Sequence, residues 1–152
     1  MIEQAVDDLR RGQGSVVLVS GDPGVGKTRL LTECYAMFTE GPVPSESTAL
    51  WLEGRCRSYA ESEPYAIYAD LLLGWLGLGP DTPAGRITAA LSTALAVLSE
   101  HVGENEKFLR SLLGVRDDGS AAATLIEPSE LQRRTFAAIR WLFATLAVER
   151  PV

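Results

Sequence analysis

The chain has 152 residues, of which 46% are hydrophobic and 22% charged, enough length and apolar content for one folded domain. Its formal net charge of -6 argues against a surface that binds nucleic acid or a membrane. No apolar run reaches the roughly 20 residues of a membrane helix, and the N-terminus lacks the apolar core of a signal peptide. We therefore expect a cytoplasmic protein.

The N-terminal region predicts a helix followed by a buried strand. Met1–Arg11 carries apolar residues on one side and charges on the other, as expected for a short amphipathic helix. Residues 15–20, Ser-Val-Val-Leu-Val-Ser, form an apolar and largely β-branched run. Such a run is typical of a strand buried inside a parallel sheet.

A glycine-rich segment follows this predicted strand and satisfies the phosphate-loop pattern GxxxxGK[ST] at every fixed position. Its residues, which we predict to bind nucleotide, are Gly21, Asp22, Pro23, Gly24, Val25, Gly26, Lys27 and Thr28. A predicted helix follows over residues 29–39, with Leu30, Leu31, Cys34, Tyr35 and Phe38 on its apolar face. The order of strand, glycine loop and helix separates a working phosphate loop from an ordinary glycine turn.

The residue types of this loop suit the chemistry of a nucleotide phosphate. Gly21, Gly24 and Gly26 allow backbone conformations in which successive N–H groups turn inward, at a helix N-terminus that already favours an anion. Lys27 supplies positive charge for the β- and γ-phosphates, and the Thr28 hydroxyl is a predicted Mg²⁺ ligand. Asp22 and Pro23 shape the turn. The expected cofactors are ATP and Mg²⁺, although no residue distinguishes adenine from guanine.

The rest of the chain predicts one more strand and then mainly helices. Ala49–Glu53 is a strand candidate, and Pro64 begins a helix that runs to Trp75. An alanine- and leucine-rich helix extends from Thr82-Pro83 to about Ser99, and a shorter one spans Asn105–Leu113. The last helix opens with a capping box at residues 129–132. Its predicted apolar stripe consists of Leu131, Phe136, Ile139, Leu142, Phe143 and Leu146.

Other chemistry-bearing side chains are better explained by structure than by function. His101 is the only histidine, which leaves little material for a histidine metal site or a catalytic triad. Cys34 and Cys56 are expected to be two buried, reduced thiols, with a disulfide as the alternative. Arg55 or Arg57 would reach a γ-phosphate as a sensor residue or an arginine finger, but a surface arginine is the more frequent case. The remaining candidates fit core packing or a solvated helix face: Trp51, Trp75, Trp141, Tyr65, Tyr68, Arg133, Arg134 and Arg140.

The segment VLVSGDPGVGKTRLL at residues 17–31 resembles the AAA-type module of the STAND signalling ATPases, also described as origin-recognition-complex-like AAA. A second block supports this resemblance: residues 52–56, Leu-Glu-Gly-Arg-Cys, then Tyr59 and Pro64-Tyr65. Such modules occur in bacterial regulators beside adenylate or guanylate cyclase domains, or ahead of LuxR-type DNA-binding domains. The resemblance covers residues 14–152 and implies a phosphate-loop strand in the middle of a parallel sheet.

The sequence departs from this family at the Walker B strand, an apolar strand that ends in two acidic residues. In the family this strand directly follows a segment similar to residues 149–152, where the sequence ends. Asp117 and Asp118 lie in a polar break, and Glu53 follows a strand that the resemblance assigns to another element. No residue for positioning the attacking water is identifiable, so we predict no catalytic residue. We also expect Val16–Val19 to be an unpaired apolar edge.

We therefore predict an α/β fold: an AAA-like P-loop NTPase with a parallel-sheet core, an incomplete sheet and a mostly helical second half. Residues 1–152 would be a partial AAA/STAND ATPase domain, with a strand–helix–strand part at 1–60 and a helical part at 61–152. The predicted function is ATP·Mg²⁺ binding as the switch module of a larger signalling protein. Its expected partners are the nucleotide, the missing C-terminal part of the domain and output domains. The alternative is a non-catalytic interaction fragment with a vestigial loop; a small-molecule kinase would need lid arginines, which we do not find.

Overall fold

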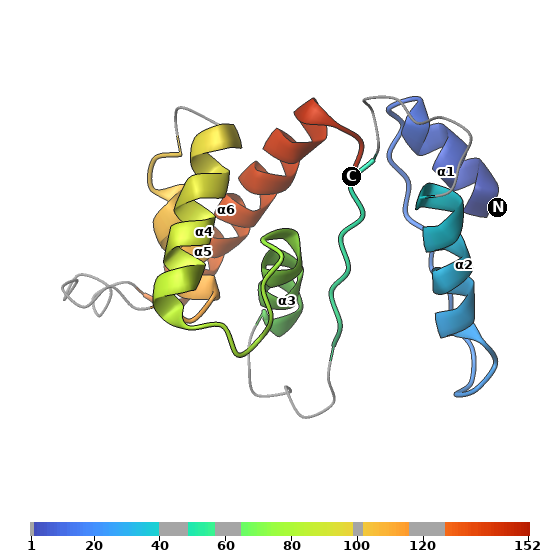
Figure 1. The fold of residues 1–152 in the computed structure, drawn as a ribbon, viewed down its shortest axis with the longest axis horizontal. Coiled ribbons are helices and arrows are strands. Elements are labelled where there is room, and N and C mark those ends of the chain that lie inside the picture. The colour runs from blue at the N-terminus through green and yellow to red at the C-terminus, as the bar shows by residue number, and fades with distance from the viewer. Residues whose placement is uncertain (1, 40–48, 57–64, 99–101, 116–126) are drawn as a thin grey trace. The chain divides into compact units, whose positions relative to one another are not determined.

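The computed structural model describes residues 2–39, 49–56, 65–98, 102–115 and 127–152. These residues form six helices, which we name α1 (Ile2–Arg10), α2 (Lys27–Thr39), α3 (Ala66–Trp75), α4 (Ala84–Leu98), α5 (Asn105–Leu112) and α6 (Pro128–Glu149) (Figure 1). Every helix predicted from the sequence is confirmed, with ends that differ by a few residues. None of the helices in the described residues is both long and apolar enough to cross a membrane.

Local signals in the sequence explain where several helices end. A glycine with positive φ follows each of α1, α3 and α5: Gly12, Gly77 and Gly114. The N–H of each glycine donates to the carbonyl three residues earlier, and the N–H of the next residue donates to the carbonyl five residues earlier. This double pattern is the Schellman motif, which glycine adopts without the steric cost that a Cβ atom imposes.

The start of α6 differs from the predicted capping box. The helix begins at Pro128, the first helical position where proline is favoured, so Ser129 lies inside the first turn instead of capping it. The carbonyl of Glu127 accepts the N–H of Leu131 and closes the first helical hydrogen bond. The N-terminal boundary of α6 therefore lies at Pro128 and not at the predicted capping box.

The predicted parallel-sheet α/β core is wrong for this structure. None of the described residues forms a strand or sheet, although both strand candidates, residues 15–20 and 49–53, lie in non-helical segments. A strand requires hydrogen-bonded neighbours, and no backbone hydrogen bond joins residues 15–20 to any other described residue. All four side chains of Val16–Val19 are exposed, but the described residues form no sheet of which this segment could be the expected unpaired edge.

The chain divides into two compact units. The phosphate-loop unit comprises Met1–Trp51 and Leu146–Val152, and the helical unit comprises Leu52–Thr145. The predicted division into a phosphate-loop part at residues 1–60 and a helical part at residues 61–152 stays a prediction.

The helical unit is built around leucines. Each of its four helices contributes at least one fully buried leucine side chain: Leu72, Leu91, Leu95, Leu109 and Leu142. Burial of one such side chain contributes about 1.5–3 kcal/mol. Helices α4 and α5 pack against each other, and Ser92 on α4 hydrogen-bonds to Glu106 on α5 (Figure 1). Tyr65 and Tyr68 both contact the ring of Phe136 edge-on, which joins α3 to α6.

The buried face of α6 is rotated relative to the predicted stripe. Leu131 and Phe136 are exposed, whereas Thr135 and Ala138 are buried together with Ile139, Leu142 and Leu146. Thr135 is accommodated there because its hydroxyl donates to the carbonyl of Leu131. Sequence reasoning favoured Leu and Phe over Thr and Ala by hydrophobicity, but the spacing of buried positions follows the helical repeat.

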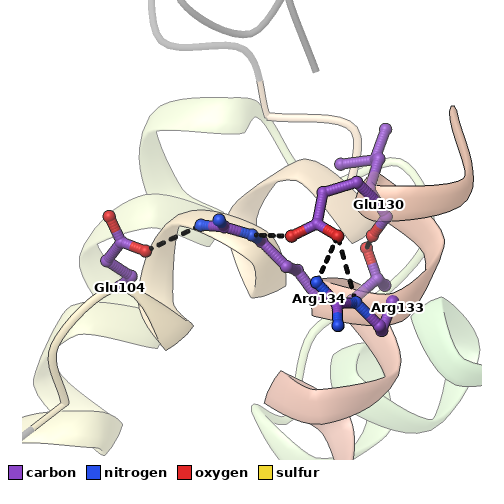
Figure 2. A network of polar contacts seen from close by, with 6 residues as sticks. Glu104, Glu130, Arg133 and Arg134 are labelled. Atoms are coloured by element: carbon purple, nitrogen blue, oxygen red, sulfur yellow. Dashed lines mark hydrogen bonds and ion pairs between the residues drawn. The ribbon is translucent and has the colours of Figure 1, made fainter. Parts of the chain in front are cut away.

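A network of ion pairs connects α6 with the N-terminal end of α5 (Figure 2). Glu130 accepts hydrogen bonds from Arg133 and Arg134, and Arg134 also reaches Glu104 at 3.1 Å. The Arg134 and Arg133 hydrogen bonds lower the pKa of the Glu130 carboxyl. The predicted solvated face of α6 is therefore exposed as expected. In addition, its Arg134 links α6 to the N-terminal end of α5.

In the phosphate-loop unit, two contacts join segments that are distant in sequence. Tyr35 on α2 contacts Trp51 edge-on, with ring centroids 5.5 Å apart, and the N–H of Leu50 donates to the carbonyl of Pro151 at 2.7 Å. On the predicted apolar face of α2, Cys34 is buried, but Leu30, Leu31 and Tyr35 are exposed. The side chain of Phe38 lies outside the described residues.

Candidate phosphate-binding loop

The candidate site is the turn between residues 21 and 26 together with the first turn of α2. Gly24 and Gly26 have φ values of 85° and 96°, which side chains with a Cβ atom rarely adopt. A Cβ at Gly21 would approach Cγ2 of Val25 to 3.0 Å. The loop geometry therefore depends on the glycines that the sequence pattern supplies.

Lys27 is folded back over this loop. Its Nζ donates hydrogen bonds to the carbonyl oxygens of Gly21 and Asp22, both at 2.8 Å. The ammonium group is thus held against the backbone of the loop that it follows in sequence. Sequence reasoning assigned Lys27 to phosphate and missed these carbonyl partners; only the reach of a long side chain across a tight turn signals them.

The loop also carries backbone donors that lack an acceptor within the described part of the chain. The N–H groups of Gly24, Gly26, Lys27, Thr28 and Arg29 donate to none of its backbone or side-chain oxygens. Unpaired donors of this kind occur at the start of every helix, where they and the helix dipole favour an anion. The first turn of α2 contains no acidic residue that would offset this preference.

Thr28 lies in the first turn of α2, and its side chain is exposed. Its carbonyl accepts a hydrogen bond from the Thr32 hydroxyl at 3.1 Å. The Thr28 hydroxyl itself forms no hydrogen bond with a described residue, so it is available as an oxygen ligand, the kind that Mg²⁺ prefers.

The other charged candidates belong to the helical unit. Glu53 accepts a 2.7 Å hydrogen bond from Nε of Arg55, and the N–H of Arg55 donates to Asp70 at 3.0 Å. Both side chains thus have partners within their own unit, which supports the structural explanation given above. Arg57, His101 and residues 117–120 lie outside the described residues.

The cysteines are free thiols, which excludes the disulfide alternative. Cys34 is buried as expected, but the expectation for Cys56 is wrong, since its side chain is exposed. No cluster of three or more His, Cys, Asp or Glu side chains that would hold a metal exists among the described residues.

Comparison with known protein families supports the interpretation of residues 21–28 as a phosphate loop. The sequence profile of the AAA ATPase domain matches residues 1–152. The chain belongs to this family. Searches of curated proteins and of solved structures gave no match.

Membership of the AAA ATPase domain family gives the loop its general role, because these domains bind nucleotide through a P-loop, usually with Mg²⁺. The residues of this AAA domain fit that group in three respects: unpaired N–H donors, a lysine at the loop and a free threonine hydroxyl. The family match does not identify the STAND subgroup or the context of a larger regulator.

Proposed function

We propose that the chain binds ATP·Mg²⁺ through residues 21–28, as the switch module of a larger cytoplasmic signalling protein of the STAND type. The observation that carries this proposal is Lys27, whose ammonium group already lies against the loop with two carbonyl partners. The AAA ATPase family match supports nucleotide as the ligand.

Lys27 would exchange carbonyl partners for phosphate oxygens when a nucleotide binds. A charged phosphate oxygen forms a stronger hydrogen bond with an ammonium group than a neutral carbonyl does. The free N–H groups of Gly24, Gly26 and the first turn of α2 would donate to the same phosphates. The Thr28 hydroxyl would ligate Mg²⁺, which neutralises phosphate charge when it is bound.

We assign no hydrolytic step to this chain. Hydrolysis requires a group that positions the attacking water and an acid that holds the metal ion, and we assign neither role to any residue. ATP would therefore act as a conformational ligand, with an effect set by its different affinities for two states of the larger protein.

The binding step is tested by calorimetric titration of the 152-residue chain with ATP and Mg²⁺. Lys27→Ala should weaken ATP binding about tenfold or more, which corresponds to the loss of one charge-assisted contact. Lys107→Ala is the matched control, because Lys107 is an exposed lysine on α5 in the helical unit. Unchanged affinity in the Lys27 variant would contradict the proposal and favour a vestigial loop in an interaction fragment.

The role of Thr28 is tested by the dependence of ATP affinity on Mg²⁺. Thr28→Ala should reduce the gain in affinity that Mg²⁺ gives, whereas Thr28→Ser, which keeps the hydroxyl, should retain it. An equal loss in both variants would show that the β-branched side chain matters instead of the hydroxyl. Circular dichroism of each variant shows whether the helices are retained.

A further inference from the structure

The residue that precedes α3 has a backbone conformation that its side chain disfavours. Tyr65 has a φ of 71° and a ψ of 13°, and it is the one residue other than glycine with a positive φ in the described part of the chain. A bulky residue in this left-handed region is strained, because its Cβ atom crowds the following carbonyl oxygen. Such strain persists only where surrounding contacts hold it, and it is often stored at positions that change conformation.

The position of Tyr65 at the start of α3 adds to the conflict. A residue that caps a helix N-terminus usually has an extended backbone and a short polar side chain that accepts a hydrogen bond from the first turn. Tyr65 has neither, and its side chain makes no cap hydrogen bond. Its carbonyl oxygen nevertheless closes the first turn, because it accepts the N–H groups of Tyr68 at 2.9 Å and Ala69 at 3.2 Å. The first turn of α3 therefore depends on a strained residue.

The ring of Tyr65 supplies the contact that holds this conformation. It meets the ring of Phe136 on α6 edge-on, with centroids 5.2 Å apart and an interplanar angle of 85°. Tyr68 meets the same ring at 5.9 Å and 88°. Edge-to-face contacts of this kind are stabilising, but Phe136 is 40% exposed and lies outside the buried core. At Tyr65, a ring contact at the surface thus opposes a strained backbone.

We propose that the start of α3 is a conformational switch, which the Phe136 ring holds closed by keeping Tyr65 in its strained conformation. When the ring contact is lost, Tyr65 leaves the left-handed region and the first turn of α3 opens. The two states differ in the φ of Tyr65 and in the hydrogen bonds that its carbonyl oxygen accepts.

Opening of this turn would reach the segment that leads into the helical unit. A Cβ atom at Gly54 would lie 2.7 Å from the carbonyl oxygen of Ile67 on α3, and the N–H of Arg55 donates to Asp70 on the same helix at 3.0 Å. Residues 52–56 therefore rest on the first half of α3, and they directly follow the phosphate-loop unit in sequence. The switch would loosen this connection. It uses no residue of the loop at 21–28, so it can fail independently of nucleotide binding.

The first test compares two substitutions that both remove the ring of Tyr65. Tyr65→Ala keeps a Cβ atom and therefore the strain, whereas Tyr65→Gly removes both. Hydrogen exchange of the Tyr68 and Ala69 N–H groups, followed by NMR, measures the opening of the first turn. Exchange should be about fivefold or more slower in Tyr65→Gly than in Tyr65→Ala. Without strain, glycine would be the less stable of the two, so equal or faster exchange in Tyr65→Gly would overturn the proposal.

The second test removes the partner ring. Phe136→Ala should speed the exchange of the Tyr68 and Ala69 N–H groups about tenfold or more, because both edge-to-face contacts are lost. Leu131→Ala is the matched control, since Leu131 lies on the same helix, is 37% exposed and has no ring to offer. Equal effects of the two variants would show that the Phe136 ring does not hold the turn closed.

The extent of opening is measured at two other amides of the Phe136→Ala variant. The N–H of Leu76, which donates to the carbonyl of Leu72 at the C-terminal end of α3, should exchange as it does in the parent chain. The N–H of Arg55 should exchange faster, together with the first turn. Fast exchange at Leu76 would indicate unfolding of the whole helix and overturn a local switch. Unchanged exchange at Arg55 would overturn the connection to residues 52–56.

Discussion

The two units of this chain differ in how they use their apolar residues. The helical unit buries leucines from all four of its helices, and its exposed large apolar residues are scattered singly: Val97, Leu131 and Phe136. Among its described residues, the phosphate-loop unit exposes many large apolar side chains, including Val16–Val19, Val25, Leu30 and Leu31. The unit that carries the candidate site therefore has the smaller core of its own.

This difference indicates where the stability of the chain resides. Local opening of a structure is easiest where few apolar contacts are buried, and binding loops usually belong to such regions. A ligand that binds only the folded loop stabilises it by mass action. We expect nucleotide to affect the stability of the phosphate-loop unit and to leave that of the helical unit largely unchanged.

The largest expected effect separates the two units by matched leucine substitutions. Leu142→Ala removes a fully buried side chain from α6 and should reduce the free energy of unfolding by about 2–5 kcal/mol. Leu18→Ala truncates an exposed side chain and should change it by less than about 0.5 kcal/mol. Urea unfolding followed by circular dichroism measures both. If Leu18→Ala lowered the free energy of unfolding as much as Leu142→Ala does, the difference in apolar burial between the two units would not explain the stability of the chain.

The next effect concerns the packing of residues 52–56 on α3 in the helical unit. A Cβ atom at Gly54 would lie 2.6 Å from Cγ of Leu71 and 2.7 Å from the carbonyl oxygen of Ile67. Since the carbonyl belongs to the helix backbone, Gly54→Ala should cost about 1–3 kcal/mol of stability in the same urea experiment.

Gly79→Ala is the control for this substitution, because nothing lies within 4 Å of a Cβ atom at Gly79 and its φ is not positive. It should leave stability nearly unchanged. If the two variants behaved alike, the close approach of residues 52–56 to α3 would be wrong.

The helices and the loop were predictable from the sequence because their signals are local. Glycines fix the C-terminal ends of α1, α3 and α5, and the pattern at residues 21–28 indicated a phosphate-loop protein, which the AAA ATPase family match supports. The sheet was not predictable in this way. A strand needs partners distant in sequence, and the apolar run at 15–20 has none among the described residues. For the same reason, the sequence did not reveal that Thr135 replaces Phe136 in the core.

The smallest expected effect concerns a polar contact between α4 and α5 in the helical unit. Glu106 on α5 accepts hydrogen bonds from the Ser92 hydroxyl and from Arg110, both at 2.6 Å. These contacts, the Ser92 bond first, lower the pKa of the Glu106 carboxyl below 4.5. Their contribution is therefore complete above pH 4.5 and is lost as the pH falls through the lowered pKa in the folded state.

Glu106→Gln keeps the size of the side chain and removes its charge. The variant should lose about 1 kcal/mol at neutral pH and show a shallower loss of stability in acid than the parent chain. Asp81→Asn is the control, because Asp81 is an exposed carboxylate with no partner among the described residues. Urea unfolding at a series of pH values gives both curves. If the acid limb stayed as steep in Glu106→Gln, the carboxylates responsible for it would lie elsewhere, and the contact between α4 and α5 would depend on its apolar side chains alone.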